Sequence, residues 1–88
     1  MKIQKAACAG TLESSDTYVE LEPGEALEIT VESVVEKQFG QRIEQAVKEV
    51  LEEYGVECAK IRIIDRGALD CTIRARVATA VLRAGGED

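Results

Sequence analysis

The chain reads TYVELEPGEALEITVE from Thr17 to Glu32, and this stretch contains two runs in which apolar and polar residues alternate. In both runs the odd-numbered residues are mostly aliphatic, whereas the even-numbered residues are mostly glutamate. Alternation with a period of two is typical of a β-strand that buries one face and exposes the other. The stretch therefore predicts two strands, each with one face in the core.

Pro23-Gly24-Glu25 separates the two runs, which predicts a β-hairpin. Residues that face each other in a hairpin point to the same side of the sheet, so we expect Leu21 to pair with Leu27. A tight two-residue turn is disfavoured because it would place Glu20 opposite Leu27 and would match the twist of the strands poorly.

The run from Lys60 to Asp65 alternates in the same way and predicts a further strand, whose neighbours in the sheet the sequence does not fix. In the hairpin register Glu20 faces Glu28, a like-charge pair that is unfavourable unless cations lie nearby. Lys60 and Arg62, on the outward face of the further strand, are the candidates to supply them.

A helix is expected after the second run. Ser33 and Glu36 fit the capping box that begins many helices, and Gly55 supplies a stop. Apolar residues recur between them at helical spacing, namely Phe39, Ile43, Val47, Val50, Leu51 and Tyr54. We therefore expect a helix from about Val34 or Glu36 to Tyr54, with these residues packed against the two strands.

Gly40 lies inside this helix, where glycine costs about 1 kcal/mol relative to alanine. We expect it to permit close packing inside the domain rather than against a partner. Asp65-Arg66-Gly67 then breaks the chain before a second amphipathic helix that ends near Ala84. The apolar residues of that helix are Leu69, Ile73, Val77, Ala80 and Val81.

Ala7 to Leu12 predicts a weaker first strand, and residues 85–88 are expected to be a frayed tail. The elements then follow the order β-β-β-α-β-α in a single domain that covers residues 1–88. We expect an α+β fold, a small and mostly antiparallel sheet with two helices packed on one face. The core must be aliphatic because the chain has only three aromatic residues.

The composition excludes several kinds of function. The 88 residues include no histidine, which excludes a Ser-His-Asp triad. The net charge of −6 argues against a nucleic-acid surface, because phosphate contacts need a positive potential. The acidity serves either solubility or a basic partner. No apolar run approaches the roughly 20 residues that span a bilayer, and no cleavable leader is found, so we expect a cytoplasmic protein without a membrane partner.

Cys8, Cys58 and Cys71 match neither a CxxC pair nor the ligand spacing of a zinc site. We expect them to be structural thiols that act as small apolar residues, and we expect no metal site.

The remaining chemistry lies in Gly10-Thr11-Leu12-Glu13-Ser14-Ser15-Asp16, whose last four residues predict a turn with Ser14 at an exposed tip. Histidine, the commonest base that activates a serine, is missing. Ser14 is therefore either an ordinary turn serine or an attachment point that another enzyme modifies. Asp16 is expected to form the turn rather than to catalyse a reaction.

Three segments in register resemble the citrate lyase acyl carrier protein family, the gamma subunit of that enzyme. They are Gly10 to Asp16, Val34-Val35-Glu36-Lys37-Gln38-Phe39-Gly40, and Gly67-Ala68-Leu69-Asp70-Cys71 leading into Ile73-Arg74-Ala75-Arg76. The resemblance spans nearly the whole chain. It does not extend to the fatty-acid type of carrier, which is a helical bundle with an Asp-Ser-Leu attachment motif.

The resemblance implies that Ser14 carries phosphoribosyl-dephospho-coenzyme A through a phosphodiester, with Ser15 in the variable position and Asp16 completing the motif. The thiol of this group holds an acetyl group, which is exchanged for citryl before cleavage to oxaloacetate and the acetyl-carrier. The implied partners are the alpha subunit (acyl transferase), the beta subunit (lyase) and the prosthetic-group transferase. The chain itself is then a carrier and not an enzyme.

Two alternatives stay open. A malonate decarboxylase carrier is similar in fold and arm, although the segment Glu36 to Gly40 favours the citrate lyase family. A non-catalytic acidic interaction domain explains the charge but not the serine motif. Arg74 and Arg76 are candidates to contact the phosphates of the arm or acidic partner surfaces, but they lie on opposite sides of a helix, and we expect at least one to be merely solvated.

Overall fold

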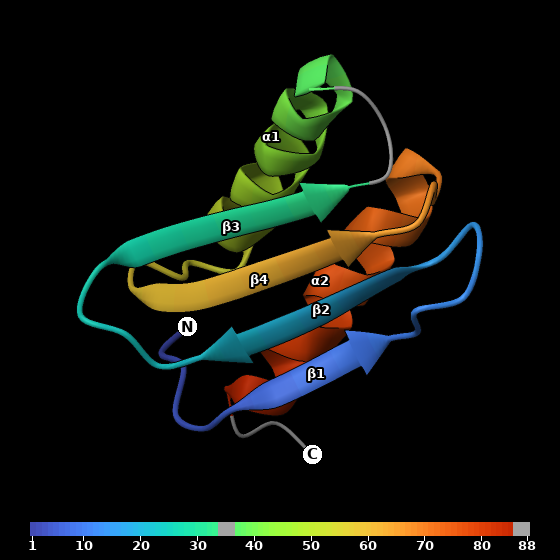
Figure 1. Cartoon of the computed structure of the whole chain (residues 1–88). Helices are drawn as coiled ribbons and strands as arrows, with labels where there is room; N and C mark the ends of the chain where they lie inside the picture. Colours follow the sequence, from blue (N-terminus) through green and yellow to red (C-terminus); the bar gives the residue numbers. More distant parts are fainter. Residues whose placement is uncertain (34–36, 86–88) are drawn as a thin grey trace.

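The computed structural model describes residues 1–33 and 37–85 and has a four-stranded sheet with both helices on one of its faces (Figure 1). The elements in chain order are β1 (Ala7–Gly10), β2 (Thr17–Glu22), β3 (Leu27–Ser33), α1 (Lys37–Glu53), β4 (Ala59–Asp65) and α2 (Asp70–Ala84). This order and the α+β class confirm the prediction. Within the described residues, no helix is long and apolar enough to cross a membrane.

The strand order β1-β2-β4-β3 shows that the expected hairpin between β2 and β3 is wrong. β4 lies between these two strands, antiparallel to β2 and parallel to β3. The sheet is therefore mixed, with antiparallel pairing at β1–β2 and β2–β4 only. Helix α1 provides the long crossover connection that parallel neighbours such as β3 and β4 require.

Charge on the exposed face of the sheet is one reason why β4, and not β3, lies next to β2. A β2–β3 hairpin would have set Glu20 opposite Glu28, whereas in the structure Glu20 pairs in register with Arg62 and Glu28 with Lys60. Arg62 forms ion pairs with Glu20 at 3.4 Å and with Glu32 at 2.7 Å. β4 thus places basic residues between two acidic strands, which confirms Arg62 as the expected cation.

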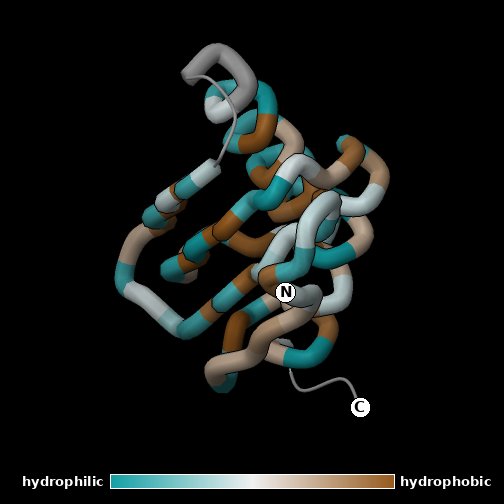
Figure 2. Tube along the Cα trace, turned by 45° about the vertical axis from the view of Figure 1, so that its right-hand side comes forward, coloured by the Kyte–Doolittle hydropathy of each residue, from teal (hydrophilic) through white to brown (hydrophobic). Residues whose placement is uncertain are grey.

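The core is aliphatic and lies between the sheet and the two helices, and the alternation that predicted the strands is visible along the chain in Figure 2. The buried strand residues are Ala9, Val19, Leu21, Ala59, Ile61 and Ile63, and the buried helical residues are Ile43, Ala46, Val47, Val50, Leu51, Ile73, Val77, Ala80, Val81 and Ala84. Helix α1 packs against β3, and α2 packs against β1 and β2.

Several apolar residues are less buried than the pattern predicted. Leu27 is 40% exposed, and Ile29 and Val31 are only half-buried, because β3 is an edge strand with a neighbour on one side. Leu69 is 72% exposed because it is the residue that precedes the first turn of α2. The side chain of Phe39 lies outside the described part of the structure, as does the expected cap at 34–36.

Gly40 corrects a further expectation. A Cβ atom built on it would meet nothing within 4 Å, so among the described residues no close packing depends on this glycine. At the other end of the chain, the Gly85 N–H donates to the carbonyl of Val81 at 2.8 Å and closes α2. The rest of the expected frayed tail, residues 86–88, lies outside the described residues.

Candidate functional site

The loop between β1 and β2, residues 11–16, carries Ser14 in an exposed turn at one end of the sheet, which confirms the expected position of this serine. The Asp16 N–H donates to the carbonyl of Glu13 at 3.2 Å and closes the turn. Ser15 adopts a φ of 66°, in the left-handed region that costs a non-glycine residue roughly 1–2 kcal/mol. The turn therefore holds Ser14 in place by a bent backbone rather than by packing.

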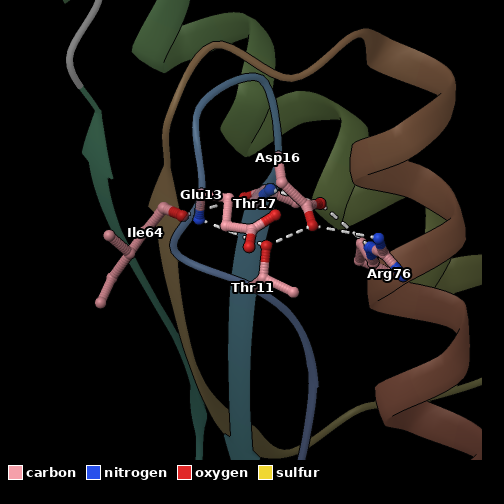
Figure 3. A network of polar contacts seen from close by, with 6 residues as sticks. All are labelled: Thr11, Glu13, Asp16, Thr17, Ile64 and Arg76. Carbon is pink, nitrogen blue, oxygen red and sulfur yellow. Dashed lines mark hydrogen bonds and ion pairs between the residues drawn. The ribbon is translucent and has the colours of Figure 1, made fainter.

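Asp16 fixes the base of this loop, as Figure 3 shows. Its carboxylate accepts hydrogen bonds from the Thr11 hydroxyl at 2.6 Å and from the Thr17 N–H at 2.7 Å. The Thr11 oxygen in turn accepts the N–H of Glu13 at 3.2 Å. Asp16 thus closes the loop from both sides, in agreement with the prediction that it forms the turn.

Arg76 of α2 ties the same carboxylate to the body of the domain (Figure 3). Its Nε and Nη2 atoms donate to the two oxygens of Asp16, each at 3.1 Å, in the two-pronged geometry that suits a guanidinium and a carboxylate. The Thr11 hydroxyl, the Thr17 N–H and Arg76, in that order, lower the pKa of Asp16 from 3.8 to about 2. Asp16 is therefore ionised at neutral pH and is a poor base.

Gly10, the first residue of the serine motif, is required by the backbone. Its φ is 91°, and a Cβ atom on it would lie 1.9 Å from the carbonyl oxygen of Thr17 and 3.3 Å from Cδ of Arg76. Only glycine lets the end of β1 approach the start of β2 so closely. Thr17 is itself fully buried, and its hydroxyl donates to the carbonyl of Ile64 at 3.2 Å.

The loop between β4 and α2 is hydrogen-bonded to the β1–β2 loop. The Ser15 N–H donates to the carbonyl of Arg66 at 2.7 Å, and the Arg66 N–H donates to the carbonyl of Asp16 at 2.9 Å. These two bonds extend the pairing of β2 with β4 past its last register pair, Thr17 with Asp65. The two loops therefore form one unit.

Asp65 holds the β4–α2 loop in shape. This residue is 2% exposed, and its carboxylate accepts the N–H groups of Gly67 and Ala68 and the hydroxyl of Ser33, each at 3.1 Å. A buried carboxylate with three donors is well satisfied, so Asp65 acts as a structural anchor of the loop.

Neither arginine that the sequence singled out on the second helix is merely solvated, which corrects that expectation. Arg76 binds Asp16, and Arg74 forms ion pairs with Asp70 one turn earlier at 2.7 Å and with Glu49 of α1 at 2.6 Å. The pairing of Arg76 with Asp16 could not be found from the sequence, because the two residues are separated by 60 positions.

The cysteines also differ from expectation, since Cys8, Cys58 and Cys71 are all exposed free thiols rather than parts of the core. Across residues 1–33 and 37–85, histidine, cysteine, aspartate and glutamate side chains form no group of three that could hold a metal ion. The β1–β2 loop thus presents the exposed side chain of Ser14, while the residues where the loop joins the two strands are held by hydrogen bonds.

Comparison with known proteins identifies the relatives of this chain. A family model described as Malonate decarboxylase delta subunit (MdcD) matches residues 4–84. Citrate lyase acyl carrier protein of Haemophilus influenzae strain PittEE is 52% identical over 87 residues, which cover 99% of this chain and 92% of that protein. The citrate lyase acyl carrier protein of Streptococcus mutans is 52% identical over 86 residues, covering 96% of this chain and 84% of the relative.

A solved structure supports the fold. One chain of a Pseudomonas malonate decarboxylase hetero-tetramer in complex with malonate superposes with a TM-score of 0.80 at 26% identity, over 94% of this chain and 87% of that chain. A match over 94% of this chain means that nearly all of the domain has a counterpart in one chain of that assembly.

Proposed function

The chain belongs to the citrate lyase acyl carrier protein family, and on this basis we propose that Ser14 is the residue to which its prosthetic group is attached. As a member of that family it is an acyl carrier subunit of a lyase complex. The observation that carries the proposal is the position of Ser14, exposed at the tip of a loop whose base is fixed by Asp16 and Arg76.

The hydroxyl groups of the loop support Ser14 over its neighbours. Thr11 is engaged, because its hydroxyl donates to Asp16 and its oxygen accepts the Glu13 N–H. The Ser14 side chain is exposed and makes no hydrogen bond with any described residue, so an enzyme can reach its oxygen without breaking the loop. Ser15 is also exposed, but it does not fill the serine position of the family motif.

The group that we propose for this site is phosphoribosyl-dephospho-coenzyme A, joined to Ser14 Oγ by a phosphodiester. When attached, it supplies a thiol that carries acetyl and citryl groups as thioesters. The residues fit this group, since the loop presents an exposed hydroxyl at Ser14 and keeps the carboxylate of Asp16 bonded to Arg76. A tether of this kind replaces a diffusing coenzyme by a high local concentration at each active site.

The same geometry supports a non-catalytic role for the chain. A serine that attacks a substrate needs a neighbouring base with a suitable pKa. The loop has two carboxylates, Glu13 and Asp16, and within the described residues Ser14 makes no hydrogen bond to either. Asp16 also has a pKa lowered to about 2, and its oxygens are already bonded. We therefore propose that a separate transferase modifies Ser14 and that the alpha and beta subunits of citrate lyase perform the acyl exchange and the cleavage.

The cytoplasm is the compartment that we propose for the chain. All three cysteines are exposed and unpaired, which suits a compartment that keeps thiols reduced.

The malonate decarboxylase carrier, one of the two alternative functions, is supported only as a related family. The structural match to malonate decarboxylase is 26% identical, whereas the citrate lyase carriers reach 52%.

Expression of the chain together with the prosthetic-group transferase, followed by intact-mass measurement, tests the proposal. The wild-type chain and Ser15→Ala should gain the mass of the prosthetic group, and Ser14→Ala should not. Ser14→Ala should lower the free energy of unfolding by no more than about 0.5 kcal/mol, because an exposed hydroxyl without partners contributes little. A full mass gain in Ser14→Ala would move the site to Ser15, and no gain in the wild-type chain would favour an interaction domain.

A further inference from the structure

The side chain of one basic residue beside the β1–β2 loop makes none of the contacts described above. Arg62, Arg74, Arg76 and Arg83 each bond an acidic side chain or a backbone carbonyl. Arg66 is exposed, and its guanidinium makes no hydrogen bond or ion pair with any residue of 1–33 and 37–85. A guanidinium always carries its charge near neutral pH, so Arg66 presents a free cation at the surface.

The backbone of Arg66 lies next to the peptide bond that follows Ser14. The Ser15 N–H that donates to the Arg66 carbonyl at 2.7 Å belongs to the peptide bond between Ser14 and Ser15. The Arg66 N–H returns a bond of 2.9 Å to the carbonyl of Asp16. The backbone of Arg66 is therefore bonded to the turn at two points, while its long side chain is exposed and makes no hydrogen bond with the described residues.

The charges around Ser14 show why a cation is useful there. Glu13 is adjacent and exposed, and the chain as a whole carries a net charge of −6, so an anion bound at Ser14 meets repulsion. Arg76 does not relieve this repulsion, because it already neutralises Asp16. Arg66 is the cation bonded to this loop whose charge has no acidic partner in the described structure.

From this geometry we infer that the Arg66 guanidinium binds the phosphodiester attached to Ser14 Oγ and so fixes the root of the arm. The inference rests on the proposed function, which places that phosphodiester on Ser14. Guanidinium groups bind phosphate oxygens through two parallel N–H donors, which gives direction as well as charge. Arg66 is then a positioning residue, which holds the first atoms of the arm and leaves its far end free.

Nuclear magnetic resonance of the wild-type chain before and after loading tests the inference without any variant. The Arg66 Nε–H resonance should shift on loading, and the shift should be lost at about 1 M NaCl, where the Debye length falls to about 3 Å. The Nε–H resonance of Arg62 is the internal reference, because Arg62 is engaged with Glu20 and Glu32 on the exposed face of the sheet. An Arg66 resonance that does not move on loading would overturn the inference.

Two matched variants separate a specific contact from a general charge effect. Arg66→Gln and Lys60→Gln each remove one exposed positive charge. Lys60 lies near the start of β4 and Arg66 directly follows its end, so the two positions are roughly 20 Å apart at about 3.3 Å per residue. In loaded chains we follow the phosphorus resonance of the phosphodiester on Ser14. It should shift in Arg66→Gln, keep its wild-type position in Lys60→Gln, and return largely to that position in Arg66→Lys. Equal phosphorus shifts in the two glutamine variants would reject a specific contact.

The outcomes also separate this inference from the proposed function. If the wild-type chain gains no mass, or if Ser14→Ala still gains it, the attachment site itself is wrong. If loading occurs at Ser14 and neither the Arg66 nor the phosphorus resonance responds as described, only the role of Arg66 is wrong. Arg66→Gln should unfold close to the wild-type temperature, because the exposed Arg66 side chain has no hydrogen bond or ion pair to lose within the described residues.

Discussion

The base of the β1–β2 loop, at Gly10 and Asp16, and its tip, at Ser14, are neighbours in sequence but differ in hydrogen bonding and in backbone packing. At the base, Asp16 accepts bonds from Thr11, Thr17 and Arg76, and Gly10 allows a backbone approach that no other residue permits. At the tip, the side chain of Ser14 is exposed and has no partner among the described residues. The loop thus combines a hydrogen-bonded base with an exposed hydroxyl that contributes little to stability.

This difference suits a carrier. An attachment serine must be reached by a modifying enzyme, yet the protein that carries the arm must present it at a defined place. A floppy loop would satisfy the first need only, and a packed serine only the second. With Ser14 as the proposed attachment residue both needs are met, because the hydrogen bonds that hold the loop are made to Asp16 and not to Ser14.

Gly10→Ala tests the rigidity of the base and has the largest expected effect on stability. The added Cβ would lie 1.9 Å from the Thr17 carbonyl oxygen at a φ of 91°, so both the packing and the backbone must change. We expect the free energy of unfolding to fall by about 2 to 4 kcal/mol, from strain and overpacking together. Urea denaturation measures it, and an unchanged midpoint would show that the close approach is not needed.

Asp16→Asn tests the ion pair between Asp16 and Arg76, which we call the clamp, and should lower stability less than Gly10→Ala. The amide keeps an oxygen that can accept from Thr17 but loses the charge that pairs with Arg76. We expect a lower thermal midpoint and faster hydrogen exchange of the Glu13 and Ser15 amides, with little change in β3. Arg76→Gln should produce the same exchange pattern, and the double variant should be no worse than the single ones if the two residues act as a pair.

The pH dependence of stability provides an independent measure of the same clamp. Because the pKa of Asp16 in the folded chain is lowered from 3.8 to about 2, its contribution is fully present above about pH 4. That contribution is lost as the pH falls from about 4 to 2, since the unfolded chain takes up the proton first. The difference in thermal midpoint between wild type and Asp16→Asn should therefore be constant near neutral pH and shrink below pH 4.

The sequence predicted features that depend on neighbouring residues and missed those that depend on distant ones. The alternation from Thr17 to Glu22 and the turn at Ser14 are local, and both are confirmed. The position of β4 between β2 and β3 brings together residues that lie far apart in the chain, such as Glu20 and Arg62. The clamp joins Asp16, in the β1–β2 loop, to Arg76, in α2, and no sequence pattern links these two positions.

Gly40→Ala, matched to Gly10→Ala, asks whether a glycine is required only where the backbone demands it. A Cβ on Gly40 would meet nothing within 4 Å, and no positive φ is found at this residue, which lies inside α1. Alanine is favoured over glycine in a helix, and it also reduces the conformational freedom of the unfolded chain. We therefore expect Gly40→Ala to stabilise the isolated chain by up to about 1 kcal/mol in urea denaturation, the smallest and the only favourable change in this series. Destabilisation by Gly40→Ala would mean that this position packs closely after all, and the contrast with Gly10 would then be lost.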